Sequence, residues 1–181
     1  MKVTPTELAG VMVLEPRLFA DARGAFFESY NLQRLDAAVG REVRFVQDNQ
    51  SVSTRNVLRG LHYQVGRPQG KLVRVIAGQI FDVAVDLRRS SSTFGRWEGF
   101  ALDAQAHRQV WIPEGFAHGF LVLSETAEVI YKTTDYYAPE QERTIRWDDS
   151  ALGIAWPLTG TPILSPKDAA GQLLADAEVF A

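Results

Sequence analysis

The chain has 181 residues, a formal charge of −3 at pH 7 and a pI of about 5.6, and 46% of its residues are hydrophobic. A chain of this length can bury its own core, so we expect one domain over residues 1–181. The charge balance does not predict a nucleic-acid partner, although a local group of Arg and Lys could bind a small anion. The sequence has no cysteine, which excludes disulfides, thiolate catalysis and cysteine metal sites.

No stretch of the sequence predicts a membrane-spanning helix or a secretory signal. No segment approaches the roughly 20 apolar residues that cross a bilayer. Residues 1–7 lack the apolar run of a signal peptide. We therefore expect a cytoplasmic protein with no membrane partner.

The first 40 residues mix short strands with one helix. We expect a strand at 11–14, a turn at 19–24 because Asp and Gly favour turns, and an aromatic strand at 25–30. A short helix should follow. Its signals are Asn31 as the N-cap, Leu32, Leu35 and Val39 on one face, and Gly40 as the stop.

Residues 43–147 read almost entirely as short strands separated by turns. One of them alternates Phe81, Val83 and Val85 with Asp82 and Asp86, which predicts a half-buried strand. The expected strands are 45–53, 57–65, 71–76, 81–87, 97–102, 109–112, 116–123 and 127–133. Their spacing of about ten residues predicts a mainly β jelly-roll sandwich or barrel.

The C-terminal part departs from this pattern. Residues 147–162 are rich in Gly and Pro and read as a loop. Ser165, Pro166 and Asp168 then form a helix-start signature, and we expect that helix to run through Leu173 and Leu174.

Three histidines bear on the question of a metal site: His62, His107 and His118. Metal-binding cupins usually carry His-x-His on one strand, but this chain has Gln64 where the second His belongs. The later cupin pattern Pro-x-Gly-x-x-His is present and ends at His118. A catalytic zinc or iron site typically uses three protein ligands, so the sequence predicts the scaffold without the metal.

A histidine and a lysine on neighbouring strands are the leading candidates for proton chemistry. Strand alternation places Gly60, His62 and Gln64 on one face, and Lys71 on a face with two valines. A lysine among valines is costly to bury unless it has a partner or a function. The alternatives are a hydrogen-bonded core histidine and a solvent-exposed lysine at a strand edge.

Two more residues have both a structural and a catalytic interpretation. Tyr131 shares a face with Val129 and is either a core tyrosine or a general acid. Asp168 is either a helix-capping acid or a carboxylate that orients His62. The sequence alone does not choose between these alternatives.

Scattered cationic and amide side chains could bind an anion, because the forked guanidinium group suits phosphate oxygens. Each of them could equally be surface charge. The candidates are Arg23, Gln47, Asn49, Arg59 and Lys167. Phe19, Phe26 and Tyr137 are core or rim aromatics, any of which could stack on a base.

Taken together, these motifs closely resemble the dTDP-4-dehydrorhamnose 3,5-epimerase family, from about Phe19 to Asp168. The segments that carry the resemblance are Gln47-Asp48-Asn49, residues 59–64, 70–75, 81–86 and 111–120, and residues 131–137. The set is specific, whereas no single motif is.

The resemblance implies a cupin-type jelly roll with short peripheral helices that needs no cofactor and acts on a dTDP-sugar as a homodimer. It implies that His62 is the base, Asp168 its partner, Tyr131 the acid on the opposite face and Lys71 the enolate stabiliser. Arg23, Gln47, Asn49, Arg59 and Lys167 would line the nucleotide-sugar site, with His118 in support. Phe19, Phe26, Glu28 and Tyr137 would surround the thymidine, some of them from the partner subunit.

The implied reaction inverts carbons 3 and 5 of a 4-keto sugar on the way to dTDP-L-rhamnose. Three alternatives remain open. The first is a deoxysugar epimerase that inverts one carbon, and Tyr131 favours the double epimerase over it. The second is a metal-dependent cupin built on His62 and His118. The third is a jelly roll that binds sugar without catalysis.

Overall fold

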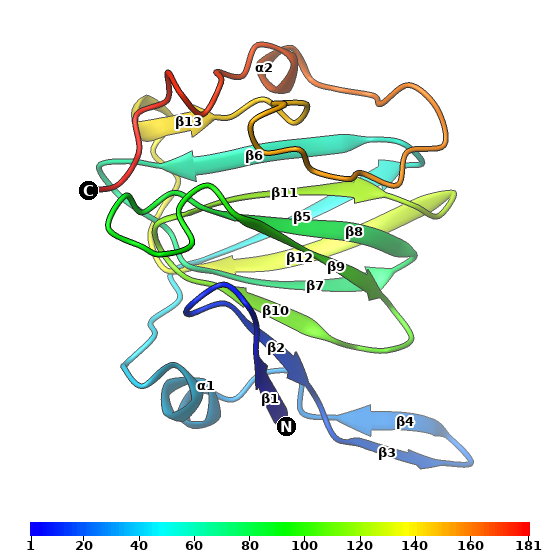
Figure 1. Ribbon diagram of the computed structural model, residues 1–181. Helices are drawn as coiled ribbons and strands as arrows, with labels where there is room; N and C mark the ends of the chain where they lie inside the picture. Colours follow the sequence, from blue (N-terminus) through cyan, green and yellow to red (C-terminus); the bar gives the residue numbers. More distant parts are fainter.

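The computed structural model describes residues 1–181 and contains two antiparallel β-sheets packed face to face (Figure 1). The six-stranded sheet has the order β1 (Lys2–Pro5), β2 (Met12–Glu15), β10 (Gln109–Ile112), β7 (Lys71–Ala77), β12 (Thr126–Thr133) and β5 (Gln47–Thr54). The five-stranded sheet has the order β13 (Glu142–Thr144), β6 (Leu58–Gln64), β11 (Phe116–Val122), β8 (Gln79–Asp86) and β9 (Trp97–Asp103). This arrangement confirms the expected mainly β jelly roll.

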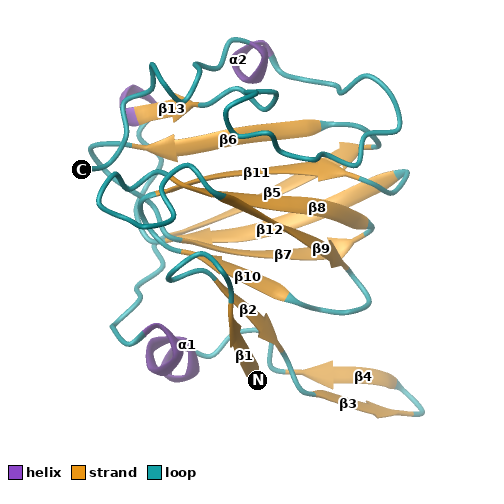
Figure 2. Ribbon diagram, viewed as in Figure 1, coloured by secondary structure: helices purple, strands orange, loops and turns teal.

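Three short helices and one hairpin lie outside the two sheets (Figure 2). They are α1 (Leu32–Val39), the 3₁₀ helix η1 (Pro139–Gln141), α2 (Pro166–Ala169), and the hairpin of β3 (Leu18–Asp21) and β4 (Gly24–Phe27). None of these helices is long and apolar enough to cross a bilayer.

The largest apolar cluster fills the space between the sheets. Val73 and Val129 come from the six-stranded sheet, and Ile80 and Phe120 come from the five-stranded sheet. Burying each such side chain contributes about 1.5–3 kcal/mol. Two smaller clusters cover the outer faces, one of them including Leu35 of α1 and the other Ala177 near the C-terminus. The sandwich is therefore covered on both sides.

The predicted helix at residues 32–39 is confirmed with both of its caps. The side-chain oxygen of Asn31 accepts a hydrogen bond from the Arg34 amide at 3.1 Å. Gly40 adopts a left-handed backbone with φ of 79°, which glycine tolerates without strain. Leu35 is the buried residue of this helix.

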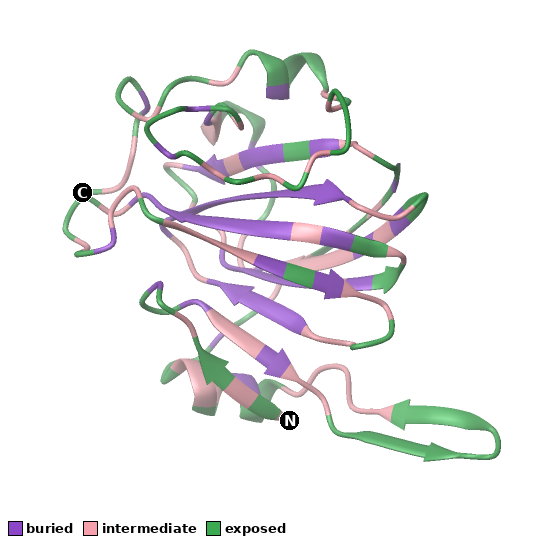
Figure 3. Ribbon diagram, turned by 45° about the vertical axis from the view of Figure 1, so that its right-hand side comes forward, coloured by how far each residue is buried: buried purple, intermediate pink, exposed green.

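The β3–β4 hairpin corrects two expectations. The stretch expected as a turn, residues 19–24, is mostly strand, and only Ala22 and Arg23 form the turn. The second strand ends at Phe27 rather than Tyr30, so the chain can enter the cap of α1. The hairpin extends away from the sheets and is largely exposed (Figure 3).

The C-terminal helix is shorter than expected and ends at Ala169 instead of Leu174. The helix ends early because the residues that follow it form backbone hydrogen bonds along β13 and the residues after β13. The Gln172 amide donates to the Thr144 carbonyl, and the Arg146 amide donates to the Gln172 carbonyl, both at 2.9 Å. At Gly171 a Cβ would lie 2.8 Å from the Arg146 amide nitrogen, so this close approach needs a glycine.

Strand β8 is buried on both faces, which corrects the expectation of a half-buried strand. Asp82 and Asp86 are fully buried, as are Val83 and Val85 on the other face. Asp86 is satisfied by Arg88, Ser91 and Thr93. Asp82 is bonded on one oxygen only. Acidic residues that alternate with apolar ones normally indicate a solvent-exposed face. In β8 both acids are buried instead, so the pattern was misleading.

Candidate active site

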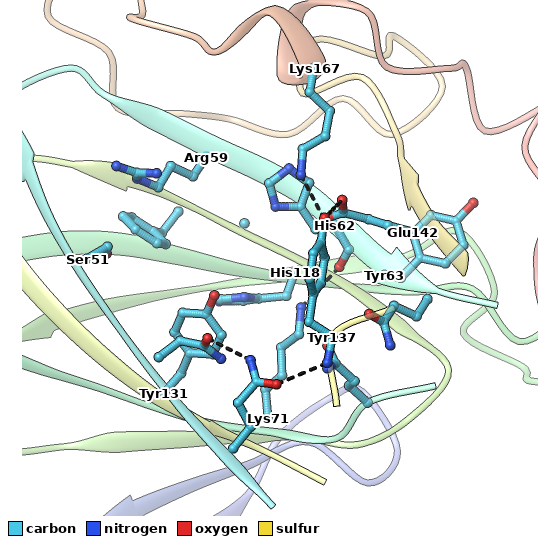
Figure 4. Close-up of a pocket in the computed structure, with 16 residues that line it drawn as sticks. Ser51, Arg59, His62, Tyr63, Lys71, His118, Tyr131, Tyr137, Glu142 and Lys167 are labelled. Atoms are coloured by element: carbon cyan, nitrogen blue, oxygen red, sulfur yellow. Dashed lines mark hydrogen bonds and ion pairs between the residues drawn. The ribbon is translucent and has the colours of Figure 1, made fainter. Parts of the chain in front are cut away.

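A pocket of about 330 Å³ opens between the two sheets, and its walls come from both of them (Figure 4). Gln47, Asn49, Lys71 and Tyr131 belong to the six-stranded sheet. Arg59, His62, His118 and Glu142 belong to the five-stranded sheet. The remaining lining residues are Ser51, Tyr63, Gln64, Gln69, Gly119, Phe120, Tyr137 and Lys167.

A bulge in β6 brings two of these side chains onto the pocket wall. His62 lies opposite His118 on β11, and Arg59 lies opposite Phe120, so β6 has one extra residue between the two pairs. Gly60 sits in this bulge with φ of 121°, where a Cβ would come within 2.5 Å of the Gly119 Cα. We predicted that Gly60 and His62 share one face of the strand, and this is wrong. Because of the bulge, Arg59 and His62 face the pocket together.

His62 is paired with Asp168, as the catalytic interpretation of that acid requires. The Nε2 atom of His62 lies 2.5 Å from Oδ1 of Asp168. The cap of α2 is Ser165, whose Oγ accepts from the Asp168 amide at 3.1 Å and donates to Oδ2 of Asp168 at 2.7 Å. The buried Asp168 carboxylate therefore holds the capping hydroxyl and also orients the imidazole.

The electrostatics of this pair favour a neutral imidazole beside a carboxylate. Burial lowers the pKa of His62, and the hydrogen bond to Asp168 only partly offsets this effect. Burial alone would raise the pKa of Asp168, but hydrogen bonds from His62 and Ser165 outweigh it and lower the pKa. Since an ionised Asp168 can only accept, Nε2 carries the proton and Nδ1 carries the lone pair.

Lys71 is buried with only 7% of its surface exposed, which rules out the strand-edge alternative. Its Nζ donates to the His62 carbonyl at 3.2 Å, next to the imidazole. Burial lowers the pKa of Lys71 to about 8, although the charges of Glu142 and Asp82 act in the opposite direction. The ammonium group is therefore charged at neutral pH but loses its proton at a lower pH than an ordinary lysine.

Tyr131 enters the pocket from β12, in the sheet opposite His62. Burial raises the pKa of its phenol, so the hydroxyl keeps its proton at neutral pH. It packs against the apolar core that contains Val129, as expected. Figure 4 shows His62 and Tyr131 on different sides of the pocket, so a base and a potential acid face a common space.

The second histidine of the pocket, His118, has its own acid. Its Nε2 lies 2.7 Å from Oδ1 of Asp82, and both side chains are buried. The His118 ring lies edge-on to Tyr131, with the ring centroids 6.4 Å apart. His118 therefore lies in the pocket, as predicted. The sequence did not single out its partner Asp82.

Polar side chains are joined to one another at the mouth of the pocket. Glu142 accepts from Lys167 Nζ at 2.7 Å and from the Tyr137 hydroxyl at 2.9 Å. These bonds lower the pKa of Glu142, although its burial acts to raise it. Gln47 donates to Asn49 at 2.8 Å. Sequence reasoning missed Glu142, because β13 is too short to give a strand signal.

Five predicted site residues do not line the pocket: Asp168 reaches it through its bond to His62, and the other four lie apart from it. Phe19 and Phe26 face each other on the hairpin and are 53% and 74% exposed. Arg23 at the turn pairs with Asp21 at 2.6 Å. Glu28 pairs with Arg34 at 3.1 Å near the start of α1. Within one chain, the structure does not bring them to the other site residues.

The two pocket histidines are held by carboxylates, and the chain has no group of three or more His, Cys, Asp or Glu side chains arranged to hold a metal ion. Each pair of a histidine and one carboxylate falls short of the three protein ligands typical of a catalytic zinc or iron site.

Comparisons with known proteins point to one family. Residues 5–176 match the model of the dTDP-4-dehydrorhamnose 3,5-epimerase family. A protein of that name from Pseudomonas aeruginosa is 58% identical over 180 residues, covering 99% of each chain. A 3-epimerase from Streptomyces niveus is 43% identical over 98% of this chain and 86% of its own.

A solved structure agrees with the sequence comparisons. The crystal structure of a dTDP-6-deoxy-D-glucose-3,5-epimerase from Legionella pneumophila, in complex with dTDP-4-keto-L-rhamnose, has a TM-score of 0.95 and 50% identity. It covers 98% of this chain and 94% of its own. The sandwich is therefore of the cupin type, and the chain belongs to the dTDP-4-dehydrorhamnose 3,5-epimerase family of isomerases.

Proposed function

We propose that this chain converts dTDP-4-dehydro-6-deoxy-D-glucose into dTDP-4-dehydro-L-rhamnose by inverting carbons 3 and 5, a step in dTDP-L-rhamnose biosynthesis. The proposal takes residues 1–181 as one epimerase domain. The observation that carries it is the pairing of a carboxylate-bound imidazole on one sheet with a protonated phenol on the other, across one pocket. The high identity to the Pseudomonas aeruginosa epimerase supports the same reaction.

His62 is the proposed base. The ketone at carbon 4 acidifies the hydrogens on carbons 3 and 5, and the Nδ1 lone pair removes one of them. The C–H electron pair becomes the carbon–carbon double bond of an enolate, and the carbonyl pair moves to oxygen. Asp168 accepts a hydrogen bond from Nε2–H throughout, remains ionised and stabilises the imidazolium that forms.

Lys71 and Tyr131 complete the proposed step. The buried Lys71 ammonium stabilises the enolate oxygen, and this interaction is stronger in a dry pocket than in water. Tyr131 then gives its proton to the same carbon from the opposite face, which inverts the centre. His62 then releases its extra proton to solvent and the Tyr131 phenolate takes one from solvent, so each inversion is balanced.

The nucleotide part of the substrate fits the polar mouth. We propose that Arg59 and Lys167 bind the diphosphate, while Gln47, Asn49 and Tyr137 contact the nucleoside side and His118 contacts the sugar. Glu142 joins this set because it already holds Lys167 and Tyr137.

We also propose a homodimer in the cytoplasm. The exposed Phe19 and Phe26 form an apolar patch on a hairpin that extends from the sheets, and such patches favour a protein partner. In a dimer, Phe19, Arg23, Phe26 and Glu28 would contact the partner's nucleotide. The absence of cysteine is compatible with a reducing compartment.

The experiment is incubation of the purified protein with dTDP-4-keto-6-deoxyglucose in heavy water, followed by location of deuterium in the product. The proposal predicts deuterium at both carbon 3 and carbon 5 with inversion of each. Deuterium at one carbon only would instead support a single-centre epimerase, the activity named for the Streptomyces niveus relative. Exchange that chelation abolishes and one metal restores would support a metal-dependent cupin. Binding without exchange would support a non-catalytic jelly roll.

A further inference from the structure

Asp82 is a buried carboxylate to which no step of the proposed reaction assigns a role. It projects from the middle of β8 into the apolar cluster between the sheets and is fully buried. Burying an ionised carboxylate typically costs several kcal/mol, which good pairing must offset. Its Oδ1 is bonded to His118 Nε2, but its Oδ2 has no hydrogen-bond partner. An apolar residue would stabilise this position more easily, so the charge of Asp82 requires a functional explanation.

The first consequence of Asp82 concerns the tautomer of His118. An ionised carboxylate only accepts hydrogen bonds, so the bonded Nε2 of His118 carries the proton. Nδ1 is then left as the acceptor for a ligand in the pocket that His118 lines. His118 also lies opposite His62 across the β6–β11 pairing, so its orientation affects the wall next to the base.

The second consequence concerns the charge of Lys71. Titratable groups from several elements line the pocket around Lys71 or lie in its wall. They are Arg59, His62 and Tyr63 of β6, Asp82 of β8, His118 of β11, Tyr131 of β12, Tyr137, Glu142 of β13, and Lys167 and Asp168 of α2. The carboxylates among them are Asp82, Glu142 and Asp168, and Asp168 is already bonded to His62 and Ser165. Glu142 is already bonded to Lys167 and Tyr137. Asp82 keeps one oxygen free of hydrogen bonds. Contacts connect it to Lys71, because Lys71 Nζ donates to the His62 carbonyl and His62 lies opposite His118, which is bonded to Asp82. The charge of Asp82 counteracts the effect of burial on the pKa of Lys71.

We propose that Asp82 is a positioning residue for the oxyanion side of the pocket, where it fixes the orientation of His118 and places a negative charge near the Lys71 ammonium. It acts through these two side chains and needs no contact with the substrate. This inference rests on the proposed function, because Lys71 stabilises an enolate only in that reaction.

Asp82→Asn separates the two effects. The amide keeps the shape and can still accept from His118 Nε2, but it has no charge. The direct readout is a nitrogen-15 NMR titration of the Lys71 ammonium, which needs no substrate. Lys71 should lose its proton at lower pH in the variant than in the wild type. Glu125→Gln, which removes one charge from the exposed turn before β12, is the matched control and should leave the titration unchanged.

The catalytic readout is the rate of deuterium exchange into substrate against pH. In Asp82→Asn the alkaline fall in rate should move to lower pH, and a displacement of one unit should cost about fivefold at pH 8 and less than about twofold at pH 6.5. An unchanged Lys71 titration, or an equal loss at every pH, overturns the inference.

A measurement on the wild type covers the case in which Asp82→Asn fails to fold. Nitrogen-15 spectra of labelled histidine should show His118 protonated at Nε2 and unprotonated at Nδ1, and the opposite tautomer would contradict the inference. If the wild type exchanges no deuterium, the proposed function fails, while the Lys71 titration still tests the effect of Asp82 on that charge.

Discussion

The pocket and the β3–β4 hairpin carry residues of one expected site, but they are built in different ways. In the pocket, strand register and buried carboxylates hold His62, Lys71 and Tyr131 within a single chain. On the hairpin, Phe19 and Phe26 contact solvent, and the Arg23 side chain is held only by a surface ion pair. Surface pairs of this kind contribute little to stability. The proposed reaction centre is therefore preorganised by the fold, whereas the hairpin residues are largely exposed within one chain.

Removing the proposed base should give the largest effect. His62→Ala should lower the rate of inversion and of deuterium exchange by about 10²–10⁴-fold, because a positioned base contributes that much. The fold should remain, since His62 is a quarter exposed and lies outside the apolar clusters. Turnover is measured by NMR of the product, and the melting temperature checks the fold.

His107→Asn is the control for that variant. His107 lies outside the pocket, and asparagine tolerates its left-handed backbone, which has φ of 55°. Near-wild-type turnover is expected. Wild-type turnover in His62→Ala would show that the base is wrongly assigned.

The second largest fall in turnover should come from removing Lys71, the proposed stabiliser of the enolate oxygen. Lys71→Met should lower turnover by about 10²–10³-fold, the usual cost of losing one donor to a developing oxyanion. Methionine fills the buried space, so the stability should change little. The KM for substrate should change much less than kcat, since the ammonium acts mainly after proton removal. A loss confined to KM would argue that Lys71 only binds the substrate.

The dependence of kcat/KM on pH should show a smaller effect, whose direction follows from the pKa shifts of His62 and Lys71. His62 must be unprotonated, so kcat/KM should fall as pH decreases through its pKa, which burial holds below the ordinary value. Lys71 must be protonated, so kcat/KM should also fall as pH rises through about 8. Each limb should change the rate about tenfold per pH unit. In Lys71→Met the alkaline limb at about pH 8 should disappear, and its persistence would assign that limb to another group.

The hairpin should show the smallest effect on the chemical step. Arg23→Ala should raise KM by less than about tenfold and leave kcat unchanged, because its charge acts on the nucleotide and not on the reacting carbons. Phe26→Ala should weaken the proposed dimer, which analytical ultracentrifugation would detect. A large fall in kcat for Arg23→Ala at saturating substrate would show that the hairpin takes part in the chemistry.

Features set by neighbouring residues could be predicted from the sequence, whereas features set by distant contacts could not. Strands with β-branched residues and the caps of α1 follow local rules, and these expectations are confirmed. For Lys71 the sequence left a buried and an exposed position open, and the structure shows the buried one. The β6 bulge depends on contact between Gly60 and Gly119, which are far apart in sequence. Asp82 looked solvent-exposed because local alternation cannot reveal that both faces of β8 are covered. Glu142 was missed because three residues of β13 give no pattern, and its partner Lys167 lies 25 residues away.

The central claim is that base and acid act from opposite sheets on one carbon. The most direct test is Tyr131→Phe incubated with substrate in heavy water. Without the phenol, His62 should still remove the proton and return deuterium from its own side. The account predicts deuterium in the substrate with its original configuration, and inversion slowed by about 10²–10⁴-fold. Inversion at the wild-type rate, or a folded variant that exchanges no deuterium at all, would contradict it.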